Sequence, residues 1–201
     1  MTRMWPKLAI LLAALCAAVS LWAGSSLAAS IRNCTWCHGT GAQGYAIAPR
    51  LAGQRALYIE GQLRGYAAHY RDNPLSRQYM WGAAANLSPD AVRDLAEYFA
   101  SLPPKSAGDG RQNLVAMGRT IFLQGVPEAN IVACQACHGP AGQGVREIPR
   151  LGGMSYFYLK RRLQEWGRGY HSTPGSPMPL AASTLGPDDI EALASYLSFI
   201  R

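Results

Sequence analysis

The sequence predicts an all-α protein of two tandem domains related by internal duplication. Three observations lead to this prediction. Apolar residues recur at helical spacing in several segments, no stretch shows sustained period-two alternation, and the two halves of the chain match at an offset of about one hundred residues. The 201 residues are 49% apolar and 15% charged, a composition typical of a folded chain rather than a disordered one.

The N-terminal segment is expected to direct the chain out of the cytoplasm. Two basic residues precede an apolar run over residues 8–23, and small residues follow, with Ala28 at the −1 position of a cleavage site. This pattern predicts an export signal over residues 1–28. The alternative is a membrane anchor that is not cleaved, because the uncharged stretch between Lys7 and Arg32 is long enough to span a bilayer.

The rest of the chain is expected to form two modules, residues 29–104 and residues 105–201. The boundary falls at PPKSAGDG (Pro103–Gly110), because its paired prolines and its glycines stop both helices and strands. The matching segments of the two modules, first module first, are HGTGAQG and HGPAGQG, PRLAGQ and PRLGGM, and MWGAAANLSPD and MPLAASTLGPD.

Each module is expected to end in an amphipathic helix. Ser88 is a favourable N-cap, Pro89 suits the first helical position, and apolar residues follow at i, i+3, i+4 and i+7. The same apolar spacing follows Gly186. Three more helices are predicted, at Leu57–Tyr66, Tyr156–Trp166 and Asn113–Gln124.

The charge of the chain does not indicate a nucleic-acid partner. The formal net charge is +7, and neither module carries a run of basic residues interleaved with aromatic ones. One basic cluster stands out, Lys160, Arg161 and Arg162 with Arg168. We expect it to be a solvated helix face, and the alternative is a docking patch for an acidic partner.

The cysteines outside the leader form two CxxCH motifs, CTWCH and CQACH. This motif attaches c-type haem, because two thiols at this spacing can add to the two vinyl groups of one porphyrin and the next residue is a histidine that can bind the iron. The sequence therefore predicts two covalently bound haem c groups, one attached at Cys34 and Cys37 with His38 as iron ligand, and one at Cys134 and Cys137 with His138.

Three other uses of cysteine pairs fit less well. A redox dithiol is usually found in an α/β context, which is missing here. A zinc site would need both pairs to share one metal, whereas the repeat places each pair in its own module. A disulfide within four residues would explain neither the histidine nor the repeat.

Methionines are predicted as the second iron ligands. Met80 and Met178 stand at matching places, each seven residues before a leucine. The alternative role, filling a gap in the core, suits Met117 and Met154 better. His69 and His171 fall at unmatched places and are predicted to be surface residues. Histidine and methionine together leave no iron position for substrate, which favours an electron carrier over an enzyme.

Pro49 and Pro149 are predicted to support the histidines. A histidine that binds iron needs an acceptor for its other ring N–H, and a carbonyl in a loop stiffened by proline would serve. The alternative is an ordinary turn proline.

With these motifs, the chain from about residue 24 to its end resembles the dihaem class I cytochromes c of the cytochrome c4 type. The resemblance implies two cytochrome c folds packed about a pseudo-twofold axis, with haems that face across the interface. It also implies a periplasmic protein, often at the membrane, that passes single electrons towards a terminal oxidase. In this family Met80 and Met178 match the axial methionines, and Pro49 and Pro149 match the histidine-orienting prolines.

One feature departs from this pattern. The helix predicted before the second motif has no evident counterpart before the first, because cleavage after Ala28 would leave only residues 29–33 ahead of Cys34. Either the first module lacks this helix, or cleavage falls earlier, or the leader is kept. In the last case its end, with Gly24, Leu27 and Ile31, would pack on the first module.

We therefore expect a periplasmic dihaem protein, not an enzyme, that exchanges electrons with a respiratory donor and a terminal oxidase, with membrane association possible. The main alternative is the haem subunit of a periplasmic dehydrogenase complex. A third reading, a haem enzyme such as a peroxidase, would need an open iron site.

Overall fold

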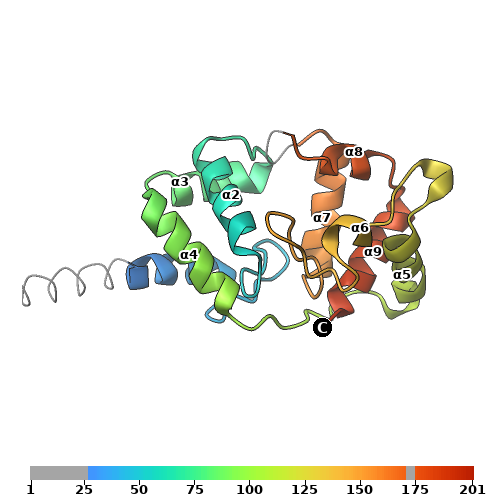
Figure 1. Ribbon diagram of the computed structural model, residues 1–201, viewed down its shortest axis with the longest axis horizontal. Coiled ribbons are helices and arrows are strands. Elements are labelled where there is room, and N and C mark those ends of the chain that lie inside the picture. The colour runs from blue at the N-terminus through green and yellow to red at the C-terminus, as the bar shows by residue number, and fades with distance from the viewer. Residues whose placement is uncertain (1–26, 171–174) are drawn as a thin grey trace, which may run out of the picture.

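The computed structural model describes residues 27–170 and 175–201. Within these residues the regular structure is helical, apart from two isolated β-bridges that join Val126 to Ile131 and Val145 to Ile148. The all-α prediction is therefore confirmed. Figure 1 shows two lobes, with helix α7 of the second lobe on the side that faces the first. We call these lobes the first and second modules; the boundary at residues 104 and 105 stays a prediction.

The first module is built around helices α2 and α4, which pack against each other. Helix α4 begins as predicted, with the Ser88 hydroxyl accepting a hydrogen bond from the Ala91 N–H at 3.2 Å. Ile59 of α2 packs with Leu95 and Phe99 of α4 in the core. The helical elements are residues 27–38, α2 (Ala56–Ala67), the π-helix η1 (Ser76–Met80), α3 (Trp81–Ala84) and α4 (Pro89–Ser101).

Residues 27–38 form one helix that runs into the first cysteine motif. Leu27 and Ile31 pack against the core of the first module. The first module therefore does have a helix ahead of its cysteines, and two of the three residues expected to pack there do so. Gly24, and most of the leader predicted over residues 1–28, lie outside the described residues.

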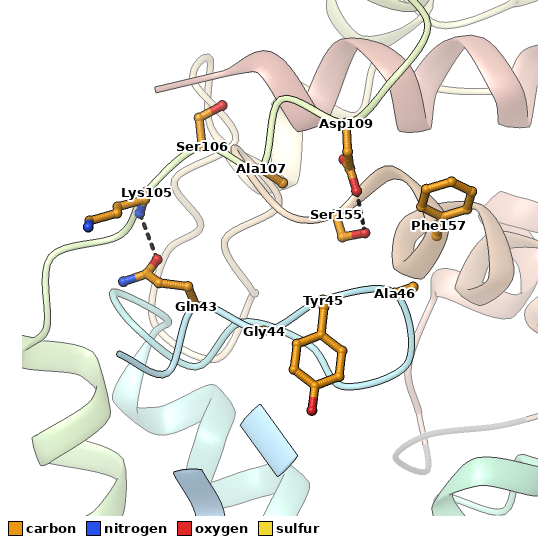
Figure 2. Close-up of a pocket in the computed structure, with 10 residues that line it drawn as sticks. All are labelled: Gln43, Gly44, Tyr45, Ala46, Lys105, Ser106, Ala107, Asp109, Ser155 and Phe157. Carbon is orange, nitrogen blue, oxygen red and sulfur yellow. Dashed lines mark hydrogen bonds between the residues drawn. The ribbon is translucent and has the colours of Figure 1, made fainter. Parts of the chain in front are cut away.

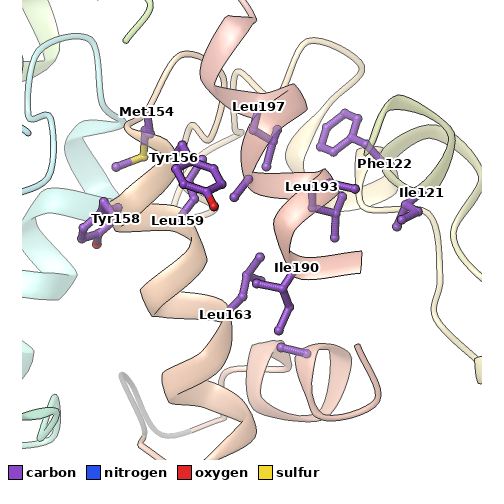
Figure 3. Packing of buried hydrophobic residues seen from close by; sticks show 13 residues of the cluster. Ile121, Phe122, Met154, Tyr156, Tyr158, Leu159, Leu163, Ile190, Leu193 and Leu197 are labelled. Carbon is purple, nitrogen blue, oxygen red and sulfur yellow. The ribbon is translucent and has the colours of Figure 1, made fainter. Parts of the chain in front are cut away.

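The second module has a larger apolar core, shown in Figure 3. Helix α5 packs against α9, and the crossing is close because Gly118 leaves room: a Cβ there would lie 2.0 Å from the Ala192 carbonyl oxygen. The predicted helices are present. The elements are η2 (Gln112–Leu114), α5 (Val115–Gln124), η3 (Pro127–Ala129), α6 (Gln135–His138), α7 (Tyr156–Gly167), α8 (Met178–Ser183) and α9 (Pro187–Phe199).

The two modules are joined by buried hydrogen bonds. The Arg50 guanidinium is 4% exposed and donates to the carbonyl oxygens of Gly152, Gly153 and Lys105 at 2.6–2.7 Å. The Gln54 side chain donates to the Arg150 carbonyl at 3.0 Å and accepts from the Arg150 N–H at 2.7 Å. Hydrogen bonds to a charged donor are the stronger kind, so Arg50 fixes the modules and their linker together.

The prediction that the basic cluster is a solvated helix face was wrong for two of its four residues, Arg161 and Arg162. Lys160 pairs with Glu191, and Arg162 is buried against Glu165. Arg161 reaches into the first module, where it donates to the carbonyl oxygens of residues 46 and 47 at 2.8 and 3.1 Å. These side chains are occupied within the protein, and only Arg168 is exposed.

No helix among residues 27–170 and 175–201 is long and apolar enough to cross a membrane.

Candidate functional site

Each cysteine motif lies at the C-terminal end of a helical segment. Cys34 and Cys37 belong to the helix of residues 27–38, and Cys134 directly precedes α6, which contains Cys137. In both pairs the first cysteine is partly buried and the second is exposed, and neither pair forms a disulfide. One turn of helix thus presents two sulfurs and the histidine that follows, twice in the same arrangement.

The two histidines of the motifs are buried and held in the same way. His38 and His138 are each 5% exposed. The Nδ1–H of His38 donates to the Pro49 carbonyl at 2.7 Å, and that of His138 donates to the Pro149 carbonyl at 2.9 Å. A carbonyl oxygen only accepts, so Nδ1 carries the proton and Nε2 keeps a free lone pair for a metal. The predicted support by the two prolines is therefore present.

Burial keeps these imidazoles neutral. Burial lowers the pKa of both His38 and His138, and it is the largest cause of the shift in each. The Arg71 charge also lowers the pKa of His38, while the hydrogen bond to Pro49 opposes both. Neutral imidazole is the form that binds a metal, so both histidines are ready to act as iron ligands at neutral pH.

The first thiol of each pair is not activated by its surroundings. Burial raises the pKa of Cys34, and it raises the pKa of Cys134 to about 11. Reactive and metal-binding cysteines are thiolates, with a pKa below the usual value. Cys34 and Cys134 therefore stay protonated at neutral pH and are not activated thiolates.

The candidate methionine ligands lie in corresponding segments after α2 and α7. Met80 is the last residue of the π-helix η1, and Met178 is the first residue of α8; both are partly buried. Met154 is a core residue, as predicted, at 4% exposure. The same prediction was wrong for Met117, which is 42% exposed.

Of the two remaining histidines, the structure describes only His69. His69 is exposed, as predicted, and its ring stacks on the Trp81 ring. His171 lies outside the described residues, so its predicted surface position is not tested.

A buried polar cluster lies between the modules, which we call the interface cluster: Tyr66, Arg71, Asn73, Tyr158, Arg162 and Glu165. Arg71 donates to the Tyr158 hydroxyl at 3.1 Å, and its guanidinium lies 5.0 Å from the centre of the Tyr66 ring. Asn73 donates to Glu165 at 3.2 Å. Sequence reasoning missed this cluster, because its members come from distant segments and only Arg162 had been singled out, as part of a basic cluster.

The interface cluster carries more positive than negative charge. Its two guanidinium groups, Arg71 and Arg162, are buried with one carboxylate, that of Glu165. Burying a charge that is not neutralised costs several kcal/mol. Moreover, buried N–H groups are left without a hydrogen-bond acceptor, among them Arg71 Nε and Trp166 Nε1. The cluster therefore fits an additional buried anion, and haem carries two carboxylate side chains.

The cavity shown in Figure 2 is separate from these groups. It measures about 510 Å³ and is lined by residues 43–46 of the first module and residues 105–107 of the linker, with Asp109, Ser155 and Phe157. The Asp109 carboxylate accepts hydrogen bonds from the Ser155 hydroxyl at 2.7 Å and from the Tyr156 N–H at 2.8 Å. It thus caps the start of α7, and the cavity contains none of the candidate haem residues.

Comparisons with known proteins agree with this geometry. The family model for cytochrome c matches the chain twice, over residues 23–103 and 115–200. The chain is 37% identical over 169 residues to cytochrome c-552 of Acidithiobacillus ferridurans, covering 83% of this chain and 73% of that protein. It is also 37% identical over 171 residues to the thiosulfate dehydrogenase electron acceptor of Stutzerimonas stutzeri strain A1501, covering 82% and 77%.

The fold is similar to that of a solved structure, cytochrome c4 of Acidithiobacillus ferrooxidans. The TM-score is 0.78 at 35% identity, and the match covers 83% of this chain and 98% of that one. Two matched domains, each with its own CxxCH motif, indicate two covalently bound haem c groups. The buried neutral histidines and the excess positive charge of the interface cluster fit these groups.

Proposed function

Because the chain belongs to the cytochrome c family, and within it to the dihaem cytochrome c4 type, we propose that it carries single electrons along a respiratory chain in the periplasm, towards a terminal oxidase. In this role it exchanges electrons with other redox proteins and catalyses no reaction of its own. The haems supply one-electron oxidation and reduction when bound. The chain's own residues hold them, fill their iron sites and join the two modules.

The observation that carries this proposal is the repeated histidine arrangement. His38 and His138 are equally buried, donate from Nδ1 to the carbonyl of a proline, and directly follow a cysteine pair. In each module the cysteines form the two thioether bonds, and the histidine binds iron through Nε2. An iron site built twice, in modules joined by buried hydrogen bonds, suits a protein that passes electrons between two centres.

Met80 and Met178 complete the two iron sites in this proposal. They lie at matching positions in the segments after α2 and α7. A thioether ligand raises the reduction potential, and a six-coordinate iron has no free position for substrate. This ligand set supports the function of an electron carrier and argues against peroxidase activity.

The test is a redox titration of the purified holoprotein combined with its mass. The mass of the mature chain should be raised by two haems that resist acid extraction. The titration should show two one-electron steps, and neither ferric iron should bind hydrogen peroxide rapidly. Loss of haem on acid extraction, or rapid peroxide turnover, would overturn the proposal.

A second function is favoured by one of the comparisons. The relative from Stutzerimonas stutzeri is described as the electron acceptor of a thiosulfate dehydrogenase, so this chain is also a candidate acceptor or haem subunit for a periplasmic dehydrogenase. Gentle purification separates the two functions. A free carrier elutes alone at its own mass, whereas a subunit elutes with a partner that reduces it when the dehydrogenase substrate is added.

The periplasmic location is part of the proposal and depends on the predicted export signal. Osmotic shock should release the haem protein if the leader is cleaved. If the leader is an anchor, detergent will be needed, and sequencing the mature N-terminus will find residues of the 8–23 stretch.

A further inference from the structure

His69 occupies a backbone position that suits glycine. It follows the C-terminal end of α2 with φ +60°, and its N–H donates to the Tyr66 carbonyl at 3.1 Å. The corresponding residue after α7 is Gly169, with φ +82° and an N–H that donates to the Trp166 carbonyl at 3.0 Å. A left-handed conformation costs free energy in residues other than glycine. The first module has a histidine at this position despite the cost, whereas the second module has a glycine.

The His69 ring has a partner that accounts for this difference. It stacks on the ring of Trp81, with the ring centres 3.9 Å apart and the planes 13° from parallel. Trp81 directly follows the candidate ligand Met80. In the second module the residue after Met178 is Pro179. Both members of the stack are therefore absent from the second module, which has glycine and proline at the two places.

The stack holds one end of the segment that carries Met80. The Trp81 Nε1–H also donates to the Arg71 carbonyl at 2.9 Å, and the Arg77 guanidinium lies 5.8 Å from the Trp81 ring. The other end of the segment is fixed by the hydrogen bond from the Ser76 hydroxyl to Asn73. Between these two points the chain forms the π-helix η1, a conformation that is rare and occurs mostly as single turns at functional sites.

From this arrangement we infer that His69 is a positioning residue: by stacking on Trp81 it holds the η1 segment in place and keeps the Met80 sulfur on the first iron. The inference rests on the proposed function, because it requires Met80 to be an iron ligand. An external ligand can take the place of Met80 only when the segment moves away. The apparent affinity for that ligand therefore rises with the fraction of molecules in which the segment has opened.

The test is a titration of the ferric holoprotein with imidazole in a Met178→His background. There the second iron has no methionine, so the weak near-infrared band of methionine-ligated ferric haem reports on Met80 alone. His69→Gly removes the ring and reproduces the residue of the second module. His69→Asn removes the ring but keeps a residue that tolerates the left-handed conformation.

Both variants should lower the imidazole concentration that removes half of the band by about two- to tenfold, the range expected for an aromatic pair. Trp81→Leu should do the same, and adding His69→Asn to it should have little further effect. Unchanged midpoints in both His69 variants, or a change in His69→Gly alone, would overturn the inference. A band that is missing before any His69 substitution would instead overturn the Met80 assignment.

Discussion

The two modules share a cysteine motif, a proline-held histidine and a C-terminal helix, but they reach these features by different routes. In the first module one helix, residues 27–38, runs directly into the cysteines. In the second, α5 ends at Gln124, and a nine-residue segment with a 3₁₀ turn separates it from Cys134. The residues that would hold the iron are thus repeated, while the scaffold around them has diverged.

The modules also differ in what stabilises them. The second has the larger apolar core and the close crossing of α5 and α9 at Gly118. The smaller core of the first module is accompanied by polar contacts that join it to the second, among them those of Arg50, Arg71 and Arg161. The difference shows that the packing has diverged around candidate haem residues that are repeated, so the residues and their packing can be tested separately.

The largest expected effect follows removal of both thioether bonds from one module. Replacing Cys134 and Cys137 by serine should yield a protein that keeps one haem after acid extraction and has a poorly folded second module, because haem forms much of the core of so small a domain. Replacing Cys34 and Cys37 should do the same to the first module. Mass spectrometry of the extracted protein measures the effect. A variant that keeps two haems after acid extraction would show that the replaced cysteines do not attach one, and a variant that loses both would show that the sites are not independent.

Substitution of glycine should have opposite effects in the two modules. Gly118→Ala places a Cβ 2.0 Å from the Ala192 carbonyl oxygen, and such overpacking should lower the free energy of unfolding of the second module by about 1–3 kcal/mol. Gly61, within α2, has no atom within 4 Å of a Cβ built there. Gly61→Ala should therefore raise the stability of the first module by about 0.5–1 kcal/mol.

Denaturant unfolding of the holoproteins, followed separately for each module by hydrogen exchange, measures both changes. Equal effects of the two substitutions would contradict the assignment of the close crossing to the second module alone.

The two aligned arginines should contribute unequally to the contact between modules. Arg50 is buried, and burial, reinforced by the charge of Arg150, lowers its pKa to about 10. Arg150 is partly exposed. Arg50→Ala removes hydrogen bonds to three carbonyl oxygens, including that of Lys105 in the linker, at a cost of about 1.5–3 kcal/mol.

Trypsin cleavage after Lys105, followed by mass spectrometry, should therefore be about tenfold faster or more in Arg50→Ala. Arg150→Ala is the matched control and should change the rate less. If both variants behave alike, Arg50 does not fix the linker.

The smallest expected loss of stability concerns the helix ahead of the first cysteines. Leu27 is partly buried against the first core, so Leu27→Ala in the full chain should lower the stability of the first module by about 1 kcal/mol, less than a fully buried leucine would. Arg32→Ala, an exposed change on the same helix, should stay within about 0.5 kcal/mol. Thermal unfolding compares the two, and equal midpoints would show that Leu27 does not support the module.

Features set by local patterns could be predicted from the sequence. The helices followed from apolar spacing and capping residues such as Ser88, and the support of His38 by Pro49 followed from the chemistry of a ligating histidine. Features set by distant partners could not. Arg161 and Arg162 belong to a basic cluster typical of a solvated face, but Arg161 donates to carbonyl oxygens of the first module and Arg162 is buried against Glu165.

The stack of His69 on Trp81 shows the same limit. The two residues are twelve positions apart and meet only because the chain turns back after α2. The histidine alone looks like a surface residue, and its backbone conformation and its neighbour are visible only in the structure.

The measurement that tests the account most directly is the near-infrared spectrum of the ferric protein with Met80→His or Met178→His. If each module holds its own iron with its own histidine and methionine, each substitution should halve the methionine band. Each should also lower the potential of one haem only, by a substantial part of the roughly 0.8 V over which axial ligands tune haem iron. A wild-type protein without the band, or one substitution that removes all of it, would contradict the account.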